Sequence, residues 1–215
     1  ALEGLISQGR EAAQAALVLE PIFDASAEWE KLVGVLEVQL QAQEDPWEKV
    51  SLLHRIATYQ EDERYIGDSS SAFSTYARAL HEDPRNEDTL SALERISENL
   101  RNWQDLASEY DKVLEQVDDP DIHIIIGLRA ARVYEEELNE VEAAIAHFQR
   151  VVEADDRNAV AIHSLSRLYR INQQWENLLG ILDLEMDISG TEEEALELKF
   201  MKAQICYQEL GKVED

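Results

Sequence analysis

Cysteine, proline, glycine and basic residues are all scarce in this chain of 215 residues. The single cysteine, Cys206, cannot form a disulfide within the chain, which excludes a disulfide framework. Four prolines and eight glycines are few for an all-β or loop-rich protein. No run approaches the roughly 18 consecutive apolar residues of a membrane-spanning helix. The first residues, ALEGL, show neither an initiator methionine nor the pattern of a signal peptide.

Basic side chains are far outnumbered by acidic ones. The 19 Lys and Arg face 46 Asp and Glu, which gives a formal net charge of −27 at pH 7. Such a field repels nucleic-acid phosphates and anionic membrane surfaces, so we expect neither as a partner. The acidity has two interpretations: solvated outer faces of helices, or attraction to a basic partner. We favour the first, because Glu forms helices well and is readily solvated.

Tryptophan marks a segment that occurs three times in the same frame. The three copies read WEKLVGVLEVQLQAQEDP from Trp29, WQDLASEYDKVLEQVDDP from Trp103 and WENLLGILDLEMDISGTE from Trp175. The steps in residue number between them are 74 and 72. Trp47 has no counterpart. Between the copies lies a second matched pair of segments, which begin at Gly67 and Asn139, so that the step of 72 recurs.

Both kinds of segment are amphipathic at helical spacing, which predicts α-helices, and no segment alternates as a strand would. The apolar stripes begin at five equivalent positions: Leu32, Ala72, Leu106, Ala144 and Leu178. The successive steps in residue number are 40, 34, 38 and 34. The longer steps place extra residues in the turns around 61–67 and 135–139.

Thirty-four residues is the period of the tetratricopeptide repeat (TPR), a helix–turn–helix unit. The second helix of that repeat carries a small residue, an aromatic four positions on, a small residue three further and then a proline. Ala72, Tyr76, Ala79 and Pro84 match this pattern fully. Looser matches are Ala144, Phe148, Val151 and Asp156, then Leu106, Tyr110 and Val113, then Leu32, Leu36 and Gln39. The resemblance implies an all-α fold, a right-handed superhelical solenoid of stacked antiparallel helix hairpins.

The resemblance covers nearly the whole chain, which we expect to form one solenoid. Its approximate repeats are 11–45, 46–85, 86–119, 120–157, 158–190 and a partial repeat 191–215. At the start, Leu2, Leu5 and Ile6 align with the end of a second helix. At the other end, GKVED aligns with NEVEA of 139–143. Both ends are therefore expected to fall inside repeats, as in a fragment of a longer array.

Acidic pairs are frequent, but none has the pattern of a catalytic or metal site. Asp118 and Asp119, like Asp155 and Asp156, fall in inter-repeat turns, where Asp caps the next helix. A catalytic pair would need two acids held across a pocket in different environments. A calcium loop would need alternating oxygen ligands around a glycine. We therefore interpret these acids as helix caps.

Other catalytic and cofactor patterns are missing as well. The five histidines lack a His or Cys partner at metal-ligand spacing. No glycine-rich phosphate loop occurs. Cys206 falls at an aromatic position of its helix, where a small buried side chain is expected. We expect no catalytic residue, no metal and no cofactor.

The resemblance points to one binding surface, the concave groove that the first helices of TPR proteins line. The groove-facing residue that follows the small position of each first helix gives a row: Thr58, Arg95, Arg132, Arg167 and Gln204. Arg170 joins this row. Further groove positions are His54, His163 and Phe200, then Tyr207, Glu61, Glu98 and Glu135.

The arginines of this row have two interpretations. They could donate two-pronged hydrogen bonds to carboxylates of a partner peptide, or pair with acidic neighbours such as Glu98 or Glu135 at helical spacing. The lysine and asparagine clamp with which some TPR proteins hold a peptide carboxylate is not found. Binding of a chaperone tail is therefore not supported.

These features predict a non-enzymatic scaffold that holds a partner peptide or helix in its groove, with self-association left open. The tryptophan-led pairs resemble TPR arrays of large bacterial proteins, which implies an envelope, secretion or motility assembly in the cytoplasm or periplasm. An alternative is a regulatory or oligomerisation arm of a larger enzyme or signalling protein. A third interpretation, an enzyme within this chain, would require a convergent polar pocket.

Overall fold

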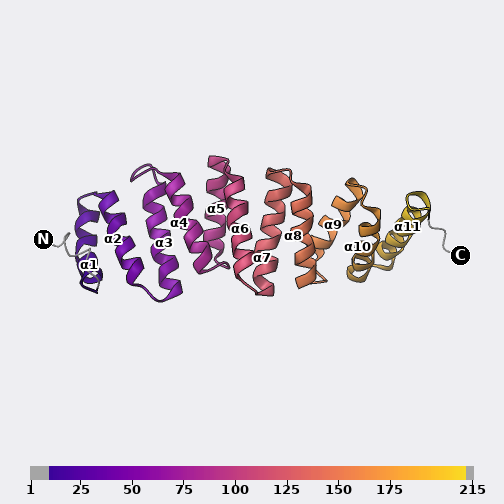
Figure 1. Cartoon of the computed structure of the whole chain (residues 1–215), viewed down its shortest axis with the longest axis horizontal. Helices are drawn as coiled ribbons and strands as arrows, with labels where there is room; N and C mark the ends of the chain where they lie inside the picture. The colour runs from indigo at the N-terminus through magenta and orange to yellow at the C-terminus, as the bar shows by residue number, and fades with distance from the viewer. Residues whose placement is uncertain (1–9, 212–215) are drawn as a thin grey trace. The chain divides into compact units, whose positions relative to one another are not determined.

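The computed structural model describes residues 10–211, which form helices joined by short turns, without a strand in that range (Figure 1). The chain divides into two compact units, one up to Glu109 and one from Tyr110. Leu2, Leu5, Ile6 and the last four residues of GKVED lie outside the described residues, so the expectation about the chain ends stays a prediction.

The first unit is built from helices that each pack on the next. They are α1 (Arg10–Ala25), α2 (Trp29–Ala42), α3 (Pro46–Glu61), α4 (Ser69–Glu82) and α5 (Glu87–Leu100). Within it α1 packs on α2, α2 on α3, α3 on α4 and α4 on α5. The division between the units falls inside α6 (Trp103–Gln116).

The second unit continues the same order. Its helices are α7 (Pro120–Arg132), the π-helical η1 (Val133–Glu137), α8 (Val141–Ala154), α9 (Ala159–Ile171), α10 (Trp175–Ile188) and α11 (Glu192–Gln208). Here α7 packs on α8, α8 on α9, α9 on α10 and α10 on α11. Within each unit consecutive helices run in opposite directions (Figure 1). The predicted all-α fold of antiparallel helix hairpins is confirmed within each unit.

The odd-numbered helices, here called the first helices, start at capping side chains. The caps of α3, α5, α7, α9 and α11 are Asp45, Asn86, Asp119, Asn158 and Thr191, whose side-chain oxygens accept backbone N–H hydrogen bonds. The prediction that Asp119 is a cap is confirmed. In ADDRN, however, the cap of α9 is Asn158, while Asp155 follows the end of α8 and accepts from the Arg157 N–H.

The turns inside the hairpins share a left-handed residue. These residues have φ between 55° and 72° and are Ala27, Gly67, Arg101, Asn139 and Gln173. Their steps in residue number, 40, 34, 38 and 34, equal those of the apolar stripes. After α3 the extra residues lie in the turn, as predicted. After α7 that prediction is only partly right, because the π-helical η1 extends the helix and takes up residues 133–137.

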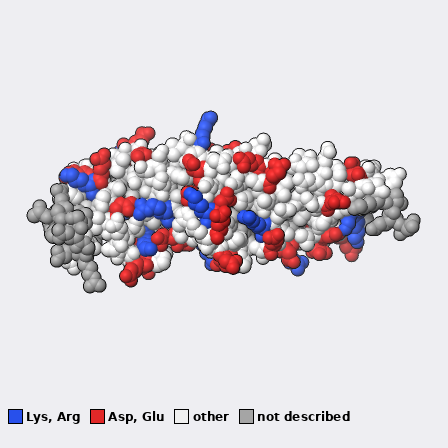
Figure 2. All heavy atoms as spheres, viewed as in Figure 1, with Lys and Arg blue, Asp and Glu red and all other residues white. Residues whose placement is uncertain are grey.

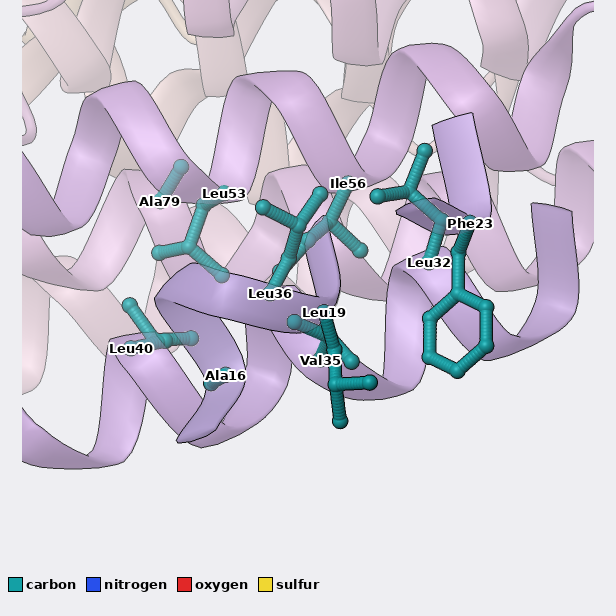
Figure 3. Close-up of a cluster of buried hydrophobic side chains, with 10 residues drawn as sticks. All are labelled: Ala16, Leu19, Phe23, Leu32, Val35, Leu36, Leu40, Leu53, Ile56 and Ala79. Atoms are coloured by element: carbon teal, nitrogen blue, oxygen red, sulfur yellow. The ribbon is translucent and has the colours of Figure 1, made fainter. Parts of the chain in front are cut away.

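The apolar stripes form the core. In the first unit a buried cluster joins α1, α2, α3 and α4 (Figure 3): Ala16, Leu19, Phe23, Leu32, Val35, Leu36, Leu40, Leu53, Ile56 and Ala79. At its edge Trp29 stacks on Tyr59, with ring centroids 5.8 Å apart, and meets Tyr65 edge-on at 4.8 Å. Trp29, at the start of α2, therefore packs on one aromatic ring of α3 and on another in the turn that follows α3.

Gly127 lies at a close approach between α7 and α8. A Cβ at Gly127 would lie 2.8 Å from Val151 Cγ2 on α8. Valine in a helix has one strongly preferred rotamer and cannot move aside freely. We expect Gly127→Ala to lower the free energy of unfolding by about 1–3 kcal/mol in urea denaturation, although alanine is the better helix former.

Two other helical glycines provide a matched control. A Cβ at Gly34 or Gly180 would meet no atom within 4 Å. We expect Gly34→Ala and Gly180→Ala to raise the free energy of unfolding by roughly 0.5–1 kcal/mol. The cost of Gly127→Ala should shrink in a Val151→Ala background. Equal stabilisation by all three alanines would show that α7 and α8 are not in close contact here.

Candidate functional site

Two arginines of the predicted row, one in each unit, form ion pairs with the preceding first helix or its π-helical extension. Arg95 on α5 forms a two-pronged ion pair with Glu61 on α3, in which Nη2 donates to Oε2 at 2.8 Å. Arg167 on α9 donates to Glu135 of η1 through Nη1 at 2.5 Å and Nη2 at 2.8 Å. The hydrogen bonds that the two guanidinium groups donate to these carboxylates raise the pKa of both arginines. Two equivalent sites thus make the same contact.

The ion pairs support the interpretation that these arginines pair with acidic residues of the chain, but they do not exclude binding of a partner's carboxylates. The prediction paired Glu135 with an arginine at helical spacing, whereas in the structure Glu135 accepts from Arg167 on a different helix. Arg95 pairs with Glu61 and not with Glu98. Arg132 lies exposed at the end of α7. Exposed pairs of this kind contribute at most about 1 kcal/mol each, so a partner's carboxylate could compete for them.

Ion pairs also join other helices of the first unit. Arg55 on α3 pairs with Glu20 on α1, and Arg78 on α4 pairs with Glu37 on α2. On the face in Figure 2, basic side chains lie beside acidic ones along the array instead of gathering in a patch of their own. Much of the sparse positive charge is therefore used to join neighbouring hairpins.

In the first unit the groove position of His54 is closed by neighbouring side chains. His54 Nε2 lies 2.6 Å from Thr89 Oγ1 on α5, and its ring meets Tyr76 edge-on at 5.3 Å. Burial lowers the pKa of His54, while the charge of Asp88 partly opposes this. The Thr58 hydroxyl donates back to the His54 carbonyl at 2.8 Å. These predicted groove residues stabilise one another.

In the second unit the equivalent position opens into a pocket. His163 on α9 lies at one side of a cavity of about 390 Å³ between α9, α10 and α11. Its lining residues are Ala159, His163, Glu185, Ile188, Ser189, Gly190, Glu194, Glu197, Leu198 and Met201. Counted from the small position of its helix, Leu198 stands where Thr89 stands in α5. Leucine cannot hydrogen-bond the imidazole, so the contact that closes the first unit is not made.

A smaller cavity of about 210 Å³ lies beside it, and Met201 lines both. The smaller cavity is lined by Arg170, Trp175, Met201, Gln204, Ile205, Gln208 and Glu209. Arg170 Nη2 lies 2.9 Å from Met201 Sδ, and Gln204 Nε2 donates to Gln208 Oε1 at 3.1 Å. Phe200 and Tyr207 are 72% and 69% exposed on α11 and line neither cavity.

Six of the predicted groove residues lie on α9 and α11: His163, Arg167, Arg170, Phe200, Gln204 and Tyr207. Of these, His163, Arg170 and Gln204 line a cavity. Sequence patterns missed the residues that give the larger pocket its character, Glu185, Ile188, Leu198 and Met201. Glu185 and Ile188 belong to α10, a second helix, whose residues the family pattern does not assign to the groove. Cys206 is only half-buried, so the expectation of a buried cysteine is wrong.

A buried polar cluster joins α6, η1 and α8 within the second unit. The Tyr134 hydroxyl donates to Asp111 Oδ2 at 2.6 Å, His147 Nε2 lies 3.1 Å from Asp111 Oδ1, and the two rings stack. Burial alone would raise the pKa of Asp111, but the hydrogen bonds with His147 and Tyr134 outweigh it and lower the pKa. Burial and the Asp111 carboxylate raise the pKa of Tyr134. The cluster fixes the π-helical segment against its neighbours.

Two kinds of site are not found in residues 10–211. No three His, Cys, Asp or Glu side chains converge there in a way that could hold a metal ion. None of the helices in this range combines the length and the apolarity that crossing a bilayer requires.

No protein-family model matches this chain, and neither does any curated protein. Solved structures with a similar arrangement include YrrB, described as a TPR protein with an unusual peptide-binding site. It is 18% identical, with 93% of this chain and 98% of that chain covered and a TM-score of 0.42. PilF of Pseudomonas aeruginosa is 15% identical, with 92% and 85% covered and a TM-score of 0.46. At these values neither protein's function carries over to this chain.

The ion pair between Glu135 and Arg167 can be tested by exchanging its charges. Glu135→Arg and Arg167→Glu each place like charges together, so each should lower the free energy of unfolding, by up to about 1 kcal/mol. The double exchange should recover most of the loss in a double-mutant cycle. Strictly additive losses in urea denaturation at low salt would contradict a direct pair.

The Asp111 cluster predicts acid sensitivity. Because the folded state holds the pKa of Asp111 below its ordinary value, its stabilisation is complete above the unfolded pKa near 4 and is lost as the pH falls through the folded pKa. Wild type should therefore lose more thermal stability between pH 5 and pH 2 than Asp111→Asn does. Asp187→Asn, an exposed change on α10, should leave the wild-type profile unaltered.

Proposed function

We propose that this chain is a non-enzymatic scaffold for protein–protein interaction, and that it holds a partner peptide or helix on the face formed by its first helices. The observation that carries the proposal is the face of α9 and α11. Residues of both helices line a 390 Å³ pocket, and α11 also carries the exposed aromatic side chains of Phe200 and Tyr207 outside that pocket. Concave surfaces with apolar walls and a few polar groups are typical of peptide-binding sites.

The pocket does contain the residue types of a hydrolase, Ser189, His163 and Glu185, but their contacts do not form a relay. The Ser189 hydroxyl donates to the Met186 carbonyl at 2.7 Å, so its proton is not shared with an imidazole. His163 Nε2 lies 3.9 Å from Glu185 Oε1, beyond hydrogen-bond distance. A nucleophile needs a base within reach and a third group that orients the base. This geometry favours binding over catalysis.

The finer features of the proposal come from the sequence. The resemblance of the tryptophan-led pairs to bacterial TPR arrays supports a place in an envelope, secretion or motility assembly. The arginine row supports a partner that carries carboxylates. Such a partner would compete with Glu61 for Arg95 and with Glu135 for Arg167, exchanging one charged hydrogen-bond acceptor for another.

A displayed library of random peptides, selected on the immobilised chain, tests the proposal. We expect enriched peptides that bind with micromolar Kd in fluorescence anisotropy, because short segments on open grooves bind at this level. The double variant Arg132→Glu, Arg167→Glu should weaken the binding of carboxylate-bearing peptides at least tenfold while circular dichroism stays helical. Repulsion between like charges is the physical reason.

The first unit supplies a matched control. Arg55→Glu with Arg78→Glu makes the same change of charge and also breaks two ion pairs between helices, but outside the arginine row. This variant should bind the selected peptides as wild type does. A library that yields no enriched peptide would overturn the scaffold proposal. Equal loss in both double variants would remove the arginine row from it.

A further inference from the structure

The pocket between α9, α10 and α11 is acidic as well as apolar. Three carboxylates line it, those of Glu185, Glu194 and Glu197, and no Lys or Arg does. The imidazole of His163, which is exposed, also lines the pocket. The apolar part consists of Ile188, Leu198 and Met201 with the methyl of Ala159.

Glu185 is the unusual member of this lining. Its side chain is only 18% exposed, and its Oε2 is buried without a hydrogen-bond donor among the described residues. Its other oxygen, Oε1, lies 3.9 Å from His163 Nε2, too far for a hydrogen bond. A buried carboxylate oxygen without a donor costs free energy, which a cationic donor entering the pocket would recover.

The other two carboxylates differ from Glu185 in their hydrogen bonds and in their exposure. Glu194 Oε2 already accepts the Gly190 N–H at 3.1 Å, which holds this side chain at the mouth of the pocket. Glu197 lies exposed one helical turn further along α11. The acceptors that line the pocket therefore come from three separate side chains.

We propose that this pocket binds the side chain of a lysine from the partner peptide, with the aliphatic stem on Ile188, Leu198 and Met201 and the ammonium at Glu185, Glu194 and Glu197. The inference rests on the proposed scaffold function and names the chemistry of one subsite. An ammonium has three donors that can reach separate acceptors, whereas a guanidinium is best matched by both oxygens of one carboxylate.

The volume of the pocket and the torsional freedom of a glutamate side chain suit this occupant. A volume of about 390 Å³ holds an extended four-carbon stem with its ammonium and leaves room for water. The terminal torsion of a glutamate has a broad range, so Glu185 can turn Oε2 towards an arriving ammonium without leaving a favoured rotamer. Lysine stems pack on apolar surface while their charged ends reach polar groups.

The test uses a defined probe, Nα-acetyl-lysine methylamide, titrated to millimolar concentration into chain labelled at the methyl groups of Ile, Leu and Met. We expect NMR shifts of the Ile188, Leu198 and Met201 methyls that saturate together. Nα-acetyl-norleucine methylamide keeps the apolar stem but lacks the ammonium, and should bind on the order of tenfold more weakly or not at all. The arginine analogue should bind more weakly than lysine.

Variants locate the charge that matters. Glu185→Gln should weaken lysine binding on the order of tenfold, whereas Asp187→Asn, an equal change of charge outside the pocket lining on α10, should leave it unchanged. Equal shifts with the norleucine probe, stronger binding of the arginine analogue, or shifts confined to other methyls would overturn the inference. The norleucine and arginine arms use wild-type chain, so their outcomes do not depend on how a variant folds.

The outcomes for the two proposals stay separate. Enriched library peptides together with no lysine shift at the pocket would remove the lysine subsite and leave the scaffold standing. A saturable lysine shift without enriched peptides would leave a cation pocket and remove the peptide scaffold.

Discussion

Mutual burial of helix faces is the constraint on which the rest of this structure depends. Each helix is only 13–17 residues long and has one apolar stripe, which is too little surface to stabilise it alone. The stripe is buried when the preceding and following helices pack on it, as Leu32, Leu36 and Leu40 of α2 do against α1 and α3. Stability is therefore shared between neighbours, as in repeat proteins generally.

Polar groups then set where each helix begins and how neighbours align. An Asp, Asn or Thr side chain caps every first helix from α3 to α11 in the described range. A left-handed residue turns the chain between the two helices of each hairpin. Pairs such as Glu61–Arg95 and Glu135–Arg167 join a first helix to the one before it. The abundant acids that could suggest catalysis thus act as caps and as ion-pair partners.

The candidate site lies where a hydrogen bond made in the first unit has no equivalent in the second unit. In the first unit His54 has Thr89 as its hydrogen-bond partner and lies edge-on to Tyr76. In the second unit His163 and Leu198 both line a pocket, and the hydrogen bond to a threonine is not made. The carboxylate oxygen Oε2 of Glu185, another lining residue, has no hydrogen-bond donor among the described residues. Equivalent positions of two repeats thus differ in their contacts, Thr89 being replaced by Leu198, and the proposed binding site lies at the position where the hydrogen bond is missing. The function proposed for this chain rests on that difference.

The sequence by itself determined the helices, their register and the hairpin order. Apolar period and capping residues act locally, so the unequal steps between the apolar stripes reappear unchanged in the left-handed turns. The sequence also placed His163, Arg170 and Gln204 on the first helices, around the pockets where they lie. Only the tertiary structure decided that η1 is π-helical and that Arg95 forms its ion pair with Glu61 instead of Glu98. It also decided that Glu185 and Ile188 of a second helix would line the main pocket. Those outcomes depend on distances between segments that lie far apart along the chain, which local periodicity does not encode.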